Sequence, residues 1–274
     1  MGVVQKIVLA GVVMGGLGVL FGFILALVER RFRVETDPRI DEVEALLPGI
    51  NCGACGLPGC RGAAEAMVAG TAEVNQCSVG GQAVADQIGS LLGRSAQTGP
   101  VKIAVIHCCP SLKNPPQYKD IHTCLGYQSL IGSTLGCSYG CVGLGDCAQV
   151  CPSDAIRQDK NGRMSVVQEL CIGCGLCVKA CPRSAIRLHE EQHSLQLLCQ
   201  NPEKGKAVLA VCNSGCIACG LCVRACTHQA LRLEDNLPVV DYANCTECGL
   251  CVEKCPKHCL IIGTQQGQER VNAS

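Results

Sequence analysis

The longest apolar stretch of the chain lies near its N-terminus, where Ile7 to Val28 contains no charged residue. At about 1.5 Å of rise per residue, a helix of this length reaches roughly 33 Å, enough to cross a hydrocarbon layer about 30 Å thick. A cleaved signal peptide is the alternative, but the run is longer than a usual signal core and no Ala-x-Ala-like site follows it. The pattern therefore predicts a transmembrane anchor over residues 1–28.

The residues that flank this run indicate which way it crosses. Lys6 precedes it, whereas Arg30, Arg31 and Arg33 follow it. Because basic residues are retained on the cytoplasmic side, we expect a single-pass protein of the inner or plasma membrane with its large domain in the cytoplasm. That compartment is reducing and keeps cysteines as thiols.

Beyond the anchor, the apolar pattern predicts short elements. Apolar residues recur at helical spacing from Ile40 to Leu47, after an Asp37-Pro38 helix start. Further segments are predicted as helices over 61–69 and 82–92 and as a strand over 101–106. Together, these short helices predict a small module over residues 29–93.

From Cys137 onward the chain repeats one cysteine-rich pattern. Each copy has three closely spaced cysteines, a fourth before Pro or Thr, and a small or apolar residue soon afterwards. The copies pair into predicted domains over 137–187 and 214–262, separated by an insert over 188–213 and preceded by another over 101–136. The polar tail over 263–274 is predicted to be disordered.

Composition narrows the chemistry. The chain has 26 cysteines, no Trp, three Phe and four Tyr, and its formal net charge is zero. No basic field marks a nucleic-acid partner. With few large side chains for a core, metal ligation can supply folding free energy.

The repeat spacing, Cys-x-x-Cys-x-x-Cys-x-x-x-Cys, is that of bacterial ferredoxins, in which the fourth cysteine ligates the other cluster of a pair. Zinc ribbons are the alternative, but their cysteine pairs usually lie far apart in sequence. The crossing rule groups the cysteines as Cys137, Cys141, Cys147 and Cys181; Cys171, Cys174, Cys177 and Cys151; Cys216, Cys219, Cys222 and Cys255; and Cys245, Cys248, Cys251 and Cys226. The first group has longer gaps than the others, which predicts a rebuilt loop.

The other cysteines form an N-terminal group and a remainder. Cys52, Cys55, Cys60 and Cys77 are predicted to hold a [4Fe–4S] cluster, with a structural zinc site as the alternative. Cys259 takes the place of an alanine in the other repeats and is interpreted as a small buried residue. Cys108 or Cys109, with Cys124, Cys199 and Cys212, can close a further cluster, or these are unliganded thiols.

The order of these parts resembles the B subunit of the Rnf complex in its longer form. The matching stretches are Asn51-Cys-Gly-Ala-Cys-Gly-Leu-Pro-Gly-Cys60, Gly136-Cys-Ser-Tyr-Gly-Cys-Val-Gly-Leu-Gly-Asp-Cys147 and Gly215-Cys-Ile-Ala-Cys-Gly-Leu-Cys222. Longer members have Lys-Cys-Asn-Gly where this chain has His107-Cys108-Cys109-Pro110, so the match puts Cys108 in the ligand position.

The predicted fold class is accordingly α+β, with one transmembrane helix, a small helical four-cysteine Fe–S module and two bacterial-type 2[4Fe–4S] ferredoxin domains with an inserted extra Fe–S segment. At least five [4Fe–4S] clusters are expected, and six if the extra site is one. The histidines show no metal-ligand spacing and are interpreted as surface or loop residues. Basic residues near the repeats are interpreted as a solvated surface, with a docking rim as the alternative: Lys179, Arg183, Arg187, Arg224, Arg232, Lys254 and Lys257.

The resemblance implies an oxidoreductase complex that oxidises reduced ferredoxin, reduces NAD, and exports Na⁺ or H⁺. It implies that this protein takes electrons from ferredoxin and passes them through its clusters to membrane subunits, with no catalytic residues beyond the clusters. Its expected partners are ferredoxin, the other Rnf subunits and the lipid bilayer, but no nucleic acid. The alternative is a polyferredoxin-type subunit of a membrane hydrogenase or dehydrogenase.

Overall fold

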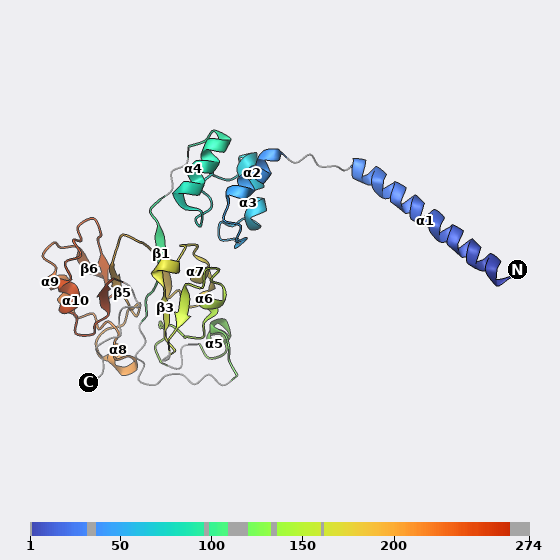
Figure 1. The fold of residues 1–274 in the computed structure, drawn as a ribbon. Coiled ribbons are helices and arrows are strands. Elements are labelled where there is room, and N and C mark those ends of the chain that lie inside the picture. The colour runs from blue at the N-terminus through green and yellow to red at the C-terminus, as the bar shows by residue number, and fades with distance from the viewer. Residues whose placement is uncertain are drawn as a thin grey trace. The chain divides into compact units, whose positions relative to one another are not determined.

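The computed structural model describes residues 2–31, 37–95, 99–108, 120–132, 136–159 and 162–263 (Figure 1). The chain divides into two compact units, Met1–Glu42 and Val43–Ser274. The first unit contains helix α1 (Val3–Arg31) and the start of α2 (Pro38–Leu46). All ferredoxin-like repeats belong to the second unit, and the tail beyond Gly263 lies outside the described residues.

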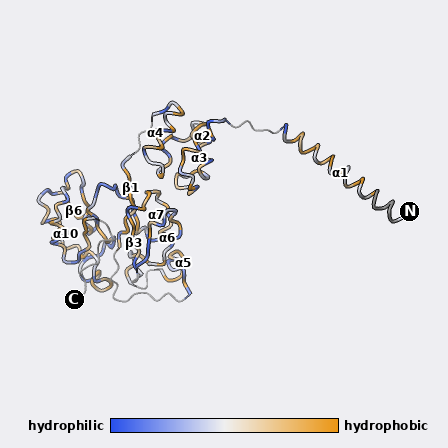
Figure 2. The backbone as a smooth tube through the Cα atoms, viewed as in Figure 1, coloured by the Kyte–Doolittle hydropathy of each residue, from blue (hydrophilic) through white to orange (hydrophobic). Residues whose placement is uncertain are grey.

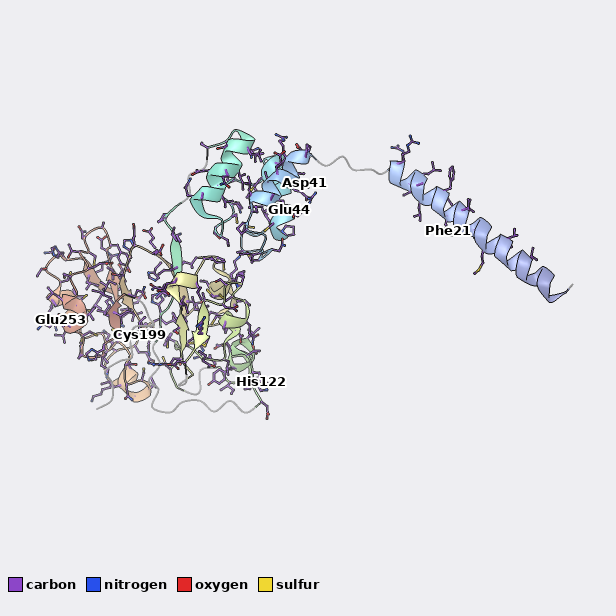
Figure 3. The ribbon with its side chains drawn as sticks, viewed as in Figure 1. Phe21, Asp41, Glu44, His122, Cys199 and Glu253 are labelled. Carbon is purple, nitrogen blue, oxygen red and sulfur yellow. The ribbon has the colours of Figure 1, made fainter. Side chains whose placement is uncertain are left out.

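Helix α1 is long and apolar enough to cross a membrane, and its segment Gly11–Val28 is exposed throughout. Figure 2 shows this helix as largely hydrophobic, and Figure 3 shows Phe21 projecting away from it. A helix satisfies its backbone hydrogen bonds internally, so exposed apolar side chains suit hydrocarbon better than water. The helix predicted from the charge-free run is therefore present.

Three helices account for the small N-terminal module. α2 is followed by α3 (Gly59–Ala69) and α4 (Gly81–Leu92), close to the ranges predicted from the sequence. Val43, Met67 and Ile88, one from each helix, are fully buried. Arg61 also bonds Glu44, its Nη1 lying 2.8 Å from Oε2, which ties α3 to α2. The module therefore has a small apolar core of its own.

Two ferredoxin-like units follow, each with an outer and an inner antiparallel strand pair. In the first ferredoxin unit, taken here as residues 102–190, the outer pair is β1 (Lys102–Ile106) with β4 (Ile186–Glu190), and the inner pair is β2 (Ile156–Gln158) with β3 (Met164–Val166). In the second, residues 195–263, the outer pair is β5 (Leu195–Leu197) with β8 (Leu260–Ile262), and the inner pair is β6 (Leu231–Glu234) with β7 (Leu237–Val240). Both segments predicted as inserts therefore supply an outer strand.

Short helices connect these strands. The first ferredoxin unit has α5 (Cys124–Leu130), α6 (Asp146–Gln149), a 3-10 turn (Gln168–Leu170) and α7 (Leu176–Ala180). Between β5 and β6 lie α8 (Lys206–Val211) and α9 (Leu221–Ala225), and α10 (Leu250–Glu253) precedes β8. Each core mixes strand residues with cysteines. In the first ferredoxin unit Ile106, Val166 and Ile186 pack with Cys147 and Cys177.

The small residue of each repeat is buried beneath the strands: Ala155, Ala185, Ala230 and Cys259 are at most 3% exposed. The residue before each of them has a positive φ, near 50° in all four copies, which turns the chain sharply after the fourth cysteine. Cys259 thus occupies a position that the methyl side chain of alanine fills in the other three repeats.

Gly173 shows how closely β1 packs against a cysteine loop. Its φ is +64°, and a Cβ there would collide with the backbone carbonyl of Lys102 in β1. The same repeat position holds Ala218 at φ 56° and Glu247 at φ 52°, so positive φ alone does not require glycine here. The close approach of the β1 backbone is what requires glycine at position 173.

We therefore expect Gly173→Ala to destabilise the protein by about 2–4 kcal/mol, the sum of left-handed strain and overpacking. Thermal unfolding of the full chain in detergent, followed anaerobically by circular dichroism, measures this loss. Ala218→Gly, at the matched position of the second ferredoxin unit, is expected to change stability by less than about 1 kcal/mol. Equal effects of the two substitutions would contradict the clash with Lys102.

Candidate iron–sulfur centres

Three of the predicted cysteine quartets each surround one cavity. Cys151, Cys171, Cys174 and Cys177 line the first; Cys226, Cys245, Cys248 and Cys251 line the second; and Cys216, Cys219, Cys222 and Cys255, together with Cys259, line the third. The space between the side chains, open solvent included, is about 310, 320 and 340 Å³ in that order. In each case the fourth cysteine of one repeat joins three cysteines of its paired repeat. This is the crossing that two-cluster ferredoxins use.

The local backbone explains how these thiols converge. The third cysteine of each repeat lies at the second position of a short helix, and the residue before the helix is a glycine with positive φ: Gly145, Gly175, Gly220 and Gly249. This left-handed turn, which glycine adopts without strain, carries the third cysteine back toward the first two. Cys177, Cys222 and Cys251 are consequently buried.

Backbone amides point at the fourth sulfur of three repeats. The N–H groups of Ala155, Ala185 and Ala230 donate to the sulfurs of Cys151, Cys181 and Cys226, each at 3.3 Å. Such bonds stabilise negative charge on sulfur and are one of the factors that set cluster potentials. The turn with positive φ therefore directs a backbone N–H group at the sulfur of the fourth cysteine.

The pKa values of these thiols indicate that a bound cation is needed to deprotonate them. Burial, followed by repulsion from neighbouring thiolates, raises the pKa of Cys147 and Cys177 to about 12, and it raises that of Cys222 and Cys251 to about 11. Alone, such groups stay protonated at neutral pH. Bound iron would offset both causes, because metal ligation deprotonates a coordinating thiol.

The spacing of the sulfurs fits a cluster better than a single ion. Among the described residues, no three His, Cys, Asp or Glu side chains are close enough to hold one metal ion. Zinc draws four sulfurs to within about 2.3 Å of one centre. In a [4Fe–4S] cluster each cysteine binds a different iron, so the sulfurs surround a wider space. The open cavities between these quartets match that wider arrangement.

In the N-terminal module, Cys55, Cys60 and Cys77 are neighbours. Burial raises the pKa of Cys77, and the thiolates of Cys55 and Cys60 add to the rise. Asn51 Oδ1 accepts the backbone N–H of Cys60 at 2.7 Å, which fixes the loop that also carries Cys52. The structure thus brings Cys55, Cys60 and Cys77 together, and Asn51, which bonds Cys60, directly precedes Cys52.

The structure departs from the predicted grouping at the first ferredoxin unit. Cys124, rather than Cys137, lies beside Cys141, Cys147 and Cys181, whose charges act on one another. Cys137 lines another cavity with Cys108, Cys199 and Cys212. The prediction that Cys137 shares a site with Cys141 and that Cys124 belongs to the extra site does not agree with these positions. The long gaps of this motif are the reason, because they let Cys137 turn away. Cys109 lies outside the described residues.

His107 was not singled out by its sequence, yet it is 5% exposed and lines the cavity of Cys108 and Cys137. Its Nδ1 donates to the carbonyl of Leu197 at 2.7 Å, so Nε2 accepts from His189 Nε2 at 2.9 Å. Burial, with repulsion from His189 and Arg187, lowers the pKa of His107 to about 4. A neutral histidine thus joins the end of β1 to β4 and β5. It lies in the loop that follows β1, as one of the two predicted alternatives had it, but its interpretation as a surface residue was wrong. No spacing in the sequence marks it.

Comparisons with known proteins agree with this picture. The family described as "Putative Fe-S cluster" matches residues 47–79, and two 4Fe-4S dicluster domain families match residues 138–188 and residues 170–230 and 215–259. The B subunit of an ion-translocating oxidoreductase complex from Methanosarcina acetivorans is 41% identical over 74% of this chain and 78% of its own length.

Two bacterial relatives cover more of the chain. The B subunit of a Na⁺-translocating ferredoxin:NAD⁺ oxidoreductase complex from Acetobacterium woodii is 39% identical over 93% of this chain and 78% of its own. The B subunit of the proton-translocating counterpart from Clostridium ljungdahlii is 40% identical over 87% and 86%. The chain therefore belongs to the family of B subunits of ion-translocating oxidoreductase complexes, the Rnf family, and is an iron–sulfur electron-transfer component of such a complex.

Proposed function

We propose that this chain takes electrons from reduced ferredoxin and passes them through a row of [4Fe–4S] clusters to membrane subunits, while the whole complex reduces NAD⁺ and exports Na⁺ or H⁺. The 24 proposed ligands are the sixteen cysteines predicted from the four repeats, the group Cys52, Cys55, Cys60 and Cys77, and the four further cysteines Cys108, Cys124, Cys199 and Cys212. The observation that carries the proposal is the set of three cavities, each lined by the four predicted thiols of two crossed repeats; Cys259 lines one of them as a fifth.

The clusters would supply one-electron chemistry, and the chain's own residues tune it. Amide N–H groups at the fourth cysteines stabilise the reduced, more negative state. The burial of Cys147, Cys177 and Cys222 limits access of water to the cores. No side chain has to move a proton, because each step carries a single electron.

The proposed direction runs from the second ferredoxin unit toward the N-terminal module. That module follows the anchor directly in sequence, and Arg30 and Arg31, which end α1, favour a cytoplasmic location for everything after it. The thiolate of Cys52 also contributes to the raised pKa of Cys174, after burial and beside Cys151. A thiol of the module therefore lies within electrostatic reach of the first ferredoxin unit.

The test uses Cys60→Ser in the assembled complex. Reduced ferredoxin is expected to bleach the distal clusters as in the unaltered complex, whereas electrons no longer reach the membrane subunits and NAD⁺ reduction is lost. Visible absorbance and NADH formation measure the two steps separately. If ferredoxin reduced no cluster in this variant, the assigned direction would be wrong, and an unaltered chain free of iron would overturn the function itself.

A further inference from the structure

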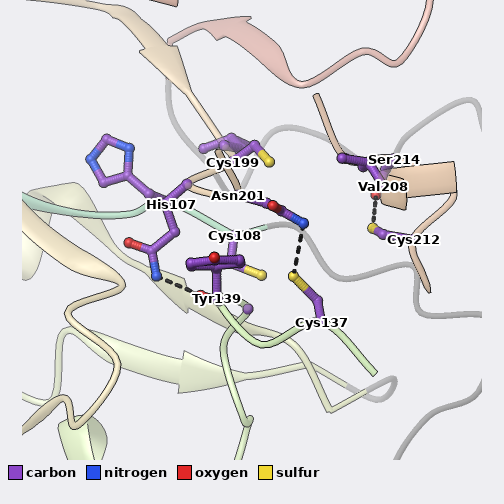
Figure 4. A pocket seen from close by; sticks show the side chains of 13 residues that line it. His107, Cys108, Cys137, Tyr139, Cys199, Asn201, Val208, Cys212 and Ser214 are labelled. Carbon is purple, nitrogen blue, oxygen red and sulfur yellow. Dashed lines mark hydrogen bonds between the residues drawn. The ribbon is translucent and has the colours of Figure 1, made fainter. Parts of the chain in front are cut away.

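Four thiols from both ferredoxin units meet at a cavity whose space, open solvent included, is about 370 Å³ and which no predicted quartet accounts for. Figure 4 shows their side chains: Cys108 and Cys137 come from the first ferredoxin unit, and Cys199 and Cys212 from the second. Cys199 and Cys212 are 8% exposed. The predicted quartets line the three ferredoxin cavities in the same way, with four sulfurs around one space.

Polar groups are directed at these sulfurs as they are at the ferredoxin quartets. Asn201 Nδ2 donates to Cys137 Sγ at 3.5 Å, and the backbone N–H of Cys216 donates to Cys199 Sγ at 3.3 Å. The sulfur of Cys212 lies 3.8 Å from Ser214 Oγ. Each of these three sulfurs thus has a hydrogen-bonding partner that suits a thiolate, and the backbone N–H of Cys141 supplies one for Cys108.

Internal symmetry relates the four residues in pairs. Cys108 lies two residues after the end of β1, and Cys199 lies two residues after the end of β5, the matching outer strand. Cys137-Ser-Tyr-Gly-Cys141 has the same Cys-x-x-Gly-Cys pattern as Cys212-Asn-Ser-Gly-Cys216. A Cβ on either glycine, Gly140 or Gly215, would contact a cysteine of this cavity. Each ferredoxin unit therefore contributes two corresponding thiols.

Cys124 takes the position that Cys137 leaves in the first ferredoxin unit. It begins α5, where Asp146 Oδ1 accepts its backbone N–H at 2.8 Å and Asp146 Oδ2 accepts that of Leu125 at 3.1 Å. Asp146 directly precedes Cys147, and Cys124 packs with Val142, which directly follows Cys141. Both contacts fix Cys124 at the loop that carries Cys141 and Cys147.

We propose that Cys108, Cys137, Cys199 and Cys212 hold a [4Fe–4S] cluster between the ferredoxin units, and that Cys124 completes the first ferredoxin cluster with Cys141, Cys147 and Cys181. This proposal rests on the proposed function, since it assumes that the quartets bind clusters. Backbone hydrogen bonds connect this bridging site to one proposed cluster site in each ferredoxin unit. The N–H of Cys216 bonds Cys199, and that of Cys141 bonds the sulfur of Cys108. It is therefore the step that connects the two ferredoxin units.

Paired cysteine-to-alanine variants of the full chain, purified anaerobically, test the exchange by iron content. Cys137→Ala/Cys212→Ala and Cys124→Ala/Cys181→Ala are each expected to lose about four iron atoms, as each single variant does, because both residues of a pair serve one cluster. Cys124→Ala/Cys212→Ala is expected to lose about eight. Cys259→Ala, which places the alanine of the other repeats at a buried cysteine, should keep all its iron.

A loss of about four iron atoms in Cys124→Ala/Cys212→Ala, and of about eight in Cys137→Ala/Cys212→Ala, would overturn the exchange. Serine variants guard against unfolding, because serine keeps an oxygen ligand. In the reduced protein, Cys137→Ser must alter the same electron paramagnetic resonance signal as Cys212→Ser, and Cys124→Ser the same signal as Cys181→Ser; the reverse matching overturns the proposal. The iron content of the unaltered chain separates the two possible failures. If the exchange alone is wrong, the unaltered chain still binds all its iron, whereas if the proposed function is wrong, it binds none.

Discussion

Replacing Cys212 by alanine is expected to divide the electron path into two. Ferredoxin should still reduce the clusters of the second ferredoxin unit, while the first ferredoxin unit and the N-terminal module stay oxidised and NAD⁺ reduction falls to background. The physical reason is position: Cys212 lines the cavity between the two ferredoxin units, and Cys199 of the same cavity is bonded by the backbone of Cys216. Without that cluster, an electron must cross the whole gap in one step.

Freeze-quenched electron paramagnetic resonance after mixing with reduced ferredoxin distinguishes the clusters on either side, and NADH formation by the assembled complex reports the whole path. Cys259→Ala removes another buried cysteine of the second ferredoxin unit, one that lines the cavity of the Cys216 quartet and not this one. Because alanine fills this position in the other repeats, the variant should still pass electrons to the first ferredoxin unit and form NADH normally. Normal NADH formation by the Cys212→Ala complex would show that electrons enter at the first ferredoxin unit instead.

Arg183→Ala is expected to cause a large loss of stability, although the residue lies outside the apolar core. The guanidinium donates to the carbonyls of Cys137, Gly140 and Gly132 at 2.8–3.0 Å, and to Gln128 Oε1 at 2.9 Å. It also lies 5.6 Å from the ring centre of Tyr127. Since hydrogen bonds to charged groups contribute about 1.5–3 kcal/mol each but do not add fully, we expect a loss of about 3 kcal/mol or more.

A loss of that size lowers the unfolding midpoint of the compact unit Val43–Ser274 by roughly 6–12 °C. Because Arg183 holds the loop of Cys137, the bridging cluster should be the first to release iron as the variant is warmed, which iron chelation during the melt detects. Lys257→Ala is the matched control. Lys257 takes the same place in the last repeat, and within the described ranges its side chain has no hydrogen bond or ion pair. Equal midpoints for the two variants would contradict the role of Arg183.

Much of this architecture could be predicted from the sequence, because cysteine spacing encodes ligand geometry almost directly. Cys171, Cys174 and Cys177 enclose a cavity with Cys151 as the crossing rule expects, and the helices and the first strand lie where the apolar pattern put them. The charge-free run likewise forms one long helix. These features are local, so a few consecutive residues decide them.

The exchange of Cys124 and Cys137 could not be predicted from local spacing. Proximity in sequence favoured Cys137 as the partner of Cys141, whereas the tertiary fold brings α5 back to that loop from further upstream. The one signal in the sequence was the shared Cys-x-x-Gly-Cys pattern at Cys137 and Cys212, which is visible only when the inserts are aligned with each other. Arg183 was interpreted as a solvated residue for a similar reason, because its carbonyl partners come from distant loops.

The cavity lined by Cys108, Cys137, Cys199 and Cys212 takes two thiols from each ferredoxin unit, and this origin also constrains how the protein matures. Cys108 and Cys137 are synthesised well before Cys199 and Cys212, and neither pair can enclose inorganic iron and sulfide alone. Scaffold enzymes that deliver the cofactor would find this position receptive only when the nascent polypeptide is essentially complete and both halves have docked. An incomplete chain would then lack this cluster, and it could not carry electrons between the two ferredoxin units.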